Sequence, residues 1–203
     1  MLAGGLFAMG VLVAGMGDLS RPSQYWDYTF HANATRVIAD TGDVAPGALR
    51  VVNDWESAEF FYPNAYHAVA AVVRDLTGAS VFEVLNAQSL FIGALAGLGL
   101  AVLLRELRAP VMVTATTPVL LSAFTAFPYD LLWRGPLLPY ATGLALLPAF
   151  VLLVRAAVER RLPVLVVLAG LGGAALLWLQ PAAALAGAVM ALCFVVQRWT
   201  RCA

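Results

Sequence analysis

The sequence contains no lysine, and charged residues of any kind are scarce. All twelve basic residues are arginines, twelve acids balance them, and charged residues make up only 12% of the chain. Because the sequence has no basic patch with interleaved aromatic residues, we expect no nucleic-acid partner. The lack of lysine also suggests a GC-rich genome.

Cysteine is almost absent. Cys193 and Cys202 lie in the last apolar segment and just beyond it, at no spacing that suits a metal ion and with no partner in the polar part of the chain. We interpret both as structural residues, and they say little about the cellular compartment.

The sequence is rich in apolar residues instead. Hydrophobic residues make up 62% of the chain and its mean hydropathy is +0.83, which is typical of integral membrane proteins. A bilayer core needs about 20 apolar residues per helix. We predict an all-α integral membrane protein that forms a single membrane domain over residues 1–203, with six transmembrane helices. These are residues 2–17, 82–104, 110–127, 138–156, 163–179 and 182–197.

A long polar loop, residues 18–81, follows the first predicted span. Within it, residues 27–41 place Phe30 and Ile38 on one helical stripe, and Gly42 provides a stop. Residues 63–77 form a second amphipathic stretch that is too short and too charged to cross a bilayer. We therefore predict two interfacial helices in this loop.

The arginines predict the orientation of the chain. If both termini lie inside and the two short helices do not cross, the inner junctions carry most of the arginines and only Glu106 and Glu159 as acids. These arginines are Arg105, Arg108, Arg155, Arg160, Arg161, Arg198 and Arg201. The positive-inside rule then places the acidic first loop on the outer face of the cell membrane.

Asp27 is the first candidate for chemistry. It begins the amphipathic stretch, and His31 and Thr35 follow it on the same helical stripe. Asp27 could act as a general base toward an acceptor hydroxyl, and His31 could tune it, bind a phosphate or help to hold a metal. Alternatively, Asp27 is a helix N-cap and His31 is merely solvated.

Other polar residues of the outer side are weaker candidates. Asp54 and Glu56 form a D-x-E pair that could share a divalent cation such as Mg²⁺ or Mn²⁺ with Asp27, or could simply be solvated. His67 could bind phosphate or orient an acceptor, and beside Tyr62 it could equally belong to an interfacial aromatic belt.

Two further residues lie at the predicted outer junctions between spans. Arg134 is the only basic residue of the second outer loop, and it could clamp a phosphate leaving group or face a lipid headgroup. Gln180, directly before Pro181, could face the same cavity.

At these residues a resemblance becomes visible. The stretch WDYTFHANATRVIADTG, followed by FYPNAYHAVAAV, resembles the first outer loop of the GT-C superfamily of membrane glycosyltransferases, including the catalytic subunits of oligosaccharyltransferases. It resembles more closely a group of actinobacterial multi-pass membrane proteins with a WD-x-x-x-H and a Y-P-x-x-x-H signature. The resemblance covers roughly residues 20–180 at the level of pattern.

The resemblance implies a function and assigns residues to it. Asp27 matches the presumed catalytic base or metal ligand, and His31, Tyr62 and His67 belong to the signature. Where oligosaccharyltransferases carry a D-x-D pair, this chain has Thr29 at the second position. The related proteins are longer, so the resemblance implies a part of a longer protein or a divergent, inactive short form.

The sequence therefore favours a glycosyltransferase that moves a sugar from a polyprenyl-phosphate donor to an acceptor at the outer face. The alternative is a noncatalytic membrane subunit that binds lipid, helps a flippase or acts as a scaffold. Runs of small residues such as GALAGLGLA would let the spans approach the helices of a membrane-protein partner closely.

Overall fold

The computed structural model describes residues 2–53 and 61–200, and all regular structure within these ranges is helical. The prediction of an all-helical chain is confirmed for this part. The elements are α1 (Leu2–Met16), α2 (Trp26–Thr41), α3 (Arg50–Asn53), α4 (Ala65–Thr77), α5 (Val81–Glu106), α6 (Val111–Leu121), the π-helical segment η1 (Thr125–Arg134), α7 (Leu138–Arg160), α8 (Pro163–Leu179) and α9 (Pro181–Thr200).

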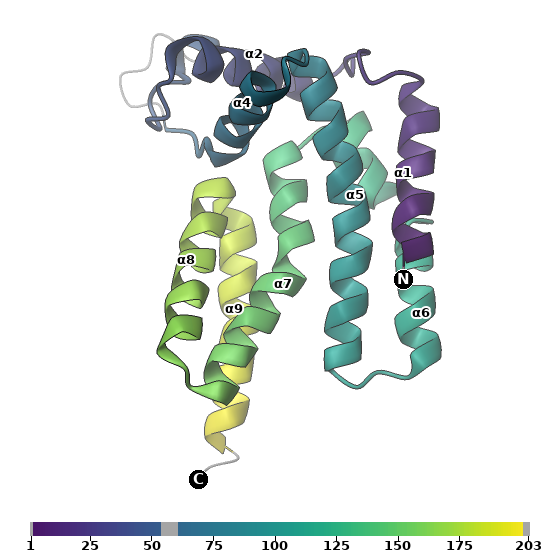
Figure 1. Ribbon diagram of the computed structural model, residues 1–203, viewed down its shortest axis with the longest axis vertical. Helices are drawn as coiled ribbons and strands as arrows, with labels where there is room; N and C mark the ends of the chain where they lie inside the picture. Colours follow the sequence, from purple (N-terminus) through teal and green to yellow (C-terminus); the bar gives the residue numbers. More distant parts are fainter. Residues whose placement is uncertain (1, 54–60, 201–203) are drawn as a thin grey trace.

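The helices form a bundle with a cap across one end (Figure 1). Within the bundle, α5 packs against α1 and α6 and also against α7, and α8 and α9 pack on α7. In the cap, α2 packs on α4, and both contact α5. The chain leaves through α9 at the end away from the cap, whereas α1 begins partway down the bundle, beside α5 and α6 (Figure 1).

The helices of the cap end where the sequence requires it. Gly42 terminates α2 with a φ of 70°, which confirms it as the stop, and Gly78 terminates α4 in the same left-handed conformation. Directly afterwards, Ser80 and Glu83 form a capping box that starts α5, in which each side chain accepts a hydrogen bond from the backbone of the other. The glycine at the end of α4 and the capping box at the start of α5 together fix the angle between these two helices.

Asn86 fastens the cap to the bundle. Its side chain is fully buried on α5 and donates to the carbonyl oxygens of Leu19 (2.7 Å) and Arg21 (2.8 Å), in the segment between α1 and α2. Its Oδ1 accepts from the Tyr28 hydroxyl of α2 at 2.9 Å. One amide therefore joins α5, the connecting segment and α2.

The helix of the predicted span 110–127 is interrupted in its second half. Helix α6 ends at Leu121, and Phe127 has extended backbone angles (φ −138°, ψ 129°). Pro128 explains the extended conformation of Phe127, because the ring of a proline disfavours the helical conformation of the residue before it. The following residues, predicted as a loop, form most of η1.

Gly143 allows α7 and α9 to approach each other closely. A Cβ atom built on Gly143 would lie 2.5 Å from the Cβ of Ala183 and 3.8 Å from that of Gln180. Any larger side chain would force α9 away from α7, since real Cβ atoms do not approach so closely.

Within residues 2–53 and 61–200, three stretches are long and apolar enough to cross a membrane, namely Val81–Glu106, Val111–Arg134, which includes the break between α6 and η1, and Leu138–Arg160. Shorter apolar helices accompany them at Gly4–Met16, Pro163–Leu179 and Pro181–Gln197. The end of the bundle away from the cap is rich in arginine, and there Arg155 of α7 donates to the backbone oxygen of Glu106 at 2.6 Å. These features describe a membrane-associated protein with chemically different ends.

Candidate functional site

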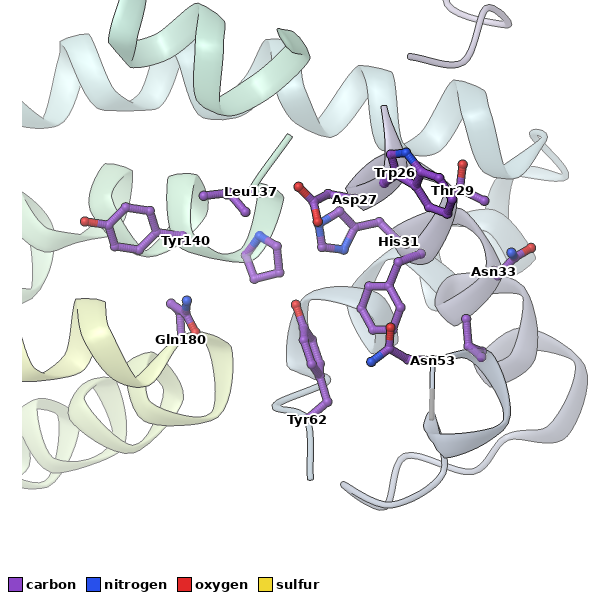
Figure 2. A pocket seen from close by; sticks show the side chains of 13 residues that line it. Trp26, Asp27, Thr29, His31, Asn33, Asn53, Tyr62, Leu137, Tyr140 and Gln180 are labelled. Atoms are coloured by element: carbon purple, nitrogen blue, oxygen red, sulfur yellow. The ribbon is translucent and has the colours of Figure 1, made fainter. Parts of the chain in front are cut away.

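A polar cavity of about 610 Å³ lies where the cap meets the bundle. It is bounded by α2 and α3, by the start of α7 and by the junction between α8 and α9 (Figure 2). Its lining residues are Trp26, Asp27, Thr29, Phe30, His31, Asn33, Val52, Asn53, Tyr62, Leu137, Pro139, Tyr140 and Gln180. Of the predicted site residues, the fold brings Asp27, His31, Tyr62 and Gln180 to this one cavity.

Asp27 is exposed in the cavity and has no hydrogen bond or ion pair to any residue that the structure describes. The N-cap of α2 is Tyr25 and makes no side-chain cap bond, so the interpretation of Asp27 as an N-cap was wrong. Its place in the first turn puts the carboxylate near the positive end of the helix dipole. Asp27 is thus a hydrogen-bond acceptor available to a ligand.

Tyr62 and Gln180 supply uncharged polar groups to the same cavity. Burial raises the pKa of Tyr62 to about 12, and the negative charge of Asp27 contributes to the shift. The phenol therefore stays protonated and can donate a hydrogen bond. Gln180 ends α8 in an extended conformation, which places it at the turn into α9 (Figure 2).

His31 and His67 form a buried pair at the back of the cavity. His31 Nε2 lies 3.0 Å from the backbone oxygen of Pro136, and its Nδ1 lies 2.9 Å from His67 Nε2. Since a carbonyl oxygen only accepts, Nε2 of His31 carries a proton, and its Nδ1 accepts from His67 Nε2. This tautomer leaves His67 Nδ1 as a bare acceptor, and that atom is buried without a partner in the part of the chain that the structure describes.

The pair is electrically neutral near pH 7. Burial lowers the pKa of His31 to about 4, despite the opposing effect of the bond to Pro136, and burial lowers the pKa of His67 well below its ordinary value. Both ring nitrogens of His31 are engaged within the protein. His31 therefore lines the cavity and holds α2 against α4 and Pro136 through the bonds of its ring. His67 lies behind His31, outside the cavity lining.

We expect the free energy of unfolding to decrease as the pH falls from about 6.5 to about 4. The folded pKa of His31 is about 4, below the ordinary value of 6.5, so the unfolded chain binds more protons in this window. Stability then rises with pH, by at most about 1.4 kcal/mol per pH unit for each histidine, and the contribution is fully present above about 6.5. Denaturant unfolding in detergent across this range measures the slope. The double variant His31→Asn, His67→Gln should flatten it, and an unchanged slope would contradict the assignment.

Arg134 does not line the cavity. Its side chain is 74% exposed and its Nη1 lies 3.9 Å from Oδ1 of Asp130, within η1. An exposed pair of this kind contributes about 0–1 kcal/mol, so it restrains Arg134 little. Arg134 lies three positions before Leu137, which does line the cavity.

The predicted metal site is described only in part. Asp54 and Glu56 lie outside the described residues, and Asp27 is the one carboxylate that the described lining contributes. Within residues 2–53 and 61–200 no group of three or more metal-binding side chains occurs. The divalent cation stays a prediction that depends on Asp54 and Glu56.

Sequence reasoning missed several lining residues, above all Tyr140 and Asn53. Tyr140 lies in the first turn of α7, and Asn53 ends the short helix α3. A polar aromatic residue directly after a proline at the start of an apolar span was a signal for Tyr140. For Asn53 the sequence offered no comparable signal, because α3 was predicted as irregular.

The charge of the cavity limits what it can bind. Among the described lining residues Asp27 is negative, none is positive, and the rest are aromatic, amide, hydroxyl or apolar groups. Such a lining suits an uncharged polyhydroxylated group, whose hydroxyls can both donate to a carboxylate and accept from Tyr62. A phosphate would need a cation from outside this set.

A family model covers the whole chain. Residues 1–203 match a family of unknown function, DUF6541, and the chain belongs to this family. No curated protein and no solved structure matches the chain.

Proposed function

We propose that this protein is a membrane glycosyltransferase that moves a sugar from a polyprenyl-phosphate donor to an acceptor at the outer face of the cell membrane. The observation that carries the proposal is the unpaired carboxylate of Asp27 in a polar cavity, at the capped end of an apolar helix bundle. We further propose that the bundle crosses the membrane six times, with the shorter apolar helices completing the set, and that the cap lies outside.

In this mechanism Asp27 takes the proton from the acceptor hydroxyl. The acceptor oxygen then attacks the anomeric carbon of the sugar, and the bond from that carbon to the phosphate oxygen breaks. The side chains of Tyr62 and Gln180 are uncharged, and they orient the sugar through hydrogen bonds. Arg134 is the candidate to stabilise the phosphate that leaves, since only a weak exposed pair with Asp130 restrains it.

The test is sugar transfer by the purified wild-type chain from a panel of radiolabelled polyprenyl-phosphate sugars, with and without EDTA. Transfer from one donor, and its loss in Asp27→Asn, would support the proposal. Loss on adding EDTA, with recovery on adding Mg²⁺ or Mn²⁺, would support the cation. Absence of transfer with every donor from folded protein would overturn the enzymatic assignment.

A second candidate is a noncatalytic membrane subunit that binds a sugar or a lipid headgroup. The charge of the cavity favours it, because no described lining residue supplies a cation for a leaving phosphate. This candidate predicts saturable binding of an uncharged glycolipid in nanodiscs without turnover. The same binding should weaken in Gln180→Ala.

A further inference from the structure

A second, apolar groove runs down the bundle below the cap. It has a volume of about 500 Å³, within the range of about 300–1,000 Å³ that is usual for small-molecule sites. Helices α4, α5, α7 and α8 all contribute to its walls. The lining residues are Ala65, Tyr66, Val69, Gln88, Phe91, Ile92, Thr142, Leu146, Ala149, Phe150, Leu153, Gly172, Ala175, Leu176 and Leu179.

The two ends of the groove differ in chemistry. Its polar residues, Tyr66, Gln88 and Thr142, all come from segments next to the cap. Deeper in the bundle, the lining from α7 continues to Leu153, eleven positions beyond Thr142, which corresponds to roughly 16 Å of helix. The deep part is entirely apolar in the described lining. An elongated amphiphile would match this polarity gradient.

Two of the polar residues carry unsatisfied groups. The hydroxyl of Tyr66 and Oε1 of Gln88 are both buried and have no hydrogen-bond partner among the described residues, and Tyr66 as a whole is only 3% exposed. Burying such a group unpaired costs roughly 1–3 kcal/mol. Burial also keeps the pKa of Tyr66 well above its ordinary value, so its hydroxyl remains a donor. Tyr66 can thus donate and Gln88 can accept.

The groove contains no charge to balance an ionic ligand. None of its described lining residues is acidic or basic. A phosphate or carboxylate placed there would lose its hydration without gaining a partner, which is strongly unfavourable. A hydroxyl group is the simplest uncharged group that accepts from a tyrosine and donates to an amide oxygen.

We propose that this groove binds the hydrocarbon chain of an uncharged lipid alcohol, with the hydroxyl of the lipid at Tyr66 and Gln88 and the chain along α7 and α8. The site is separate from the polar cavity, because none of the residues that line one lines the other. It requires no sugar transfer, so its test is independent of the proposed function.

The test uses a diazirine-bearing long-chain alcohol, cross-linked by light to the full chain in nanodiscs, with its phosphate ester as the charged counterpart. We expect the alcohol to label residues of α7 or α8 in a saturable manner, and the phosphate ester to label them at least tenfold less. Equal labelling by both probes, or labelling that does not saturate, would overturn the proposal.

Two pairs of variants locate the site. Ala175→Phe should fill the groove and abolish saturable labelling, whereas Ala174→Phe, the same change at an exposed neighbouring position outside the lining, should preserve it. Tyr66→Phe provides an independent test should Ala175→Phe fail to fold, and it should weaken binding of the alcohol about fivefold to tenfold. Gln88→Leu should also weaken this binding. Unchanged binding in both Tyr66→Phe and Gln88→Leu would overturn the role of the hydroxyl.

Discussion

Replacing His31 with alanine is expected to lower the free energy of unfolding by several kcal/mol. The change leaves two buried groups without partners, the N–H of His67 Nε2 and the backbone oxygen of Pro136. Each unsatisfied group costs about 1–3 kcal/mol, and the lost ring adds a void between α2 and α4. The unsatisfied groups and the void both lower the free energy of unfolding.

Chemical or thermal unfolding in detergent, at a pH above 7 where the histidines are neutral, measures this loss. The matched control is Asn33→Ala, which removes a polar side chain from the same helix and the same cavity at an exposed position. The control should change stability by less than about 0.5 kcal/mol. A His31→Ala variant as stable as the control would show that the histidine pair does not brace the cap.

Replacing Asp27 with asparagine is expected to abolish sugar transfer and leave the fold unchanged. General-base catalysis contributes roughly 10²–10⁴-fold to a rate, and asparagine cannot take up the proton. The carboxylate makes no hydrogen bond or ion pair with a described residue, so its loss should change stability by less than about 0.5 kcal/mol.

Asp40→Asn is the matched control, because Asp40 lies on the same helix, outside the cavity, and pairs only with exposed Arg36. It should retain full transfer. A second readout does not need turnover: since the charge of Asp27 helps to raise the pKa of Tyr62, Asp27→Asn should lower that pKa in an ultraviolet titration. Transfer that persists in Asp27→Asn would exclude Asp27 as the base.

The helices of the cap were predictable because their signals are local. Gly42 ends α2 through its left-handed conformation, and the apolar stripe of that helix follows from its own sequence. Helix α8 likewise covers Pro163–Leu179, the same range that the apolar run indicates. In contrast, η1 depends on how Pro128 interrupts an apolar segment, and hydropathy alone does not detect such a break.

The members of the site that the sequence predicted are three residues of the cap and Gln180. Asp27, His31 and Tyr62 belong to signatures that a reader can find in the sequence, but the bond from His31 to His67 joins positions 36 residues apart. Tyr140 enters the cavity through the packing of α7, α8 and α9, which no local pattern specifies. The sequence also did not reveal that both ring nitrogens of His31 bond within the protein.

The close contact at Gly143 has a consequence for selectivity. Tyr140 lies about one helical turn before Gly143 on α7, and Gln180 lies about one turn before Ala183 at the start of α9, so the two cavity residues flank this point of contact. The absence of a side chain at position 143 thus determines the distance between Tyr140 and Gln180. Position 143 lies outside the cavity lining, but the size of its side chain would determine the width of the cavity. It would therefore determine which ligands fit.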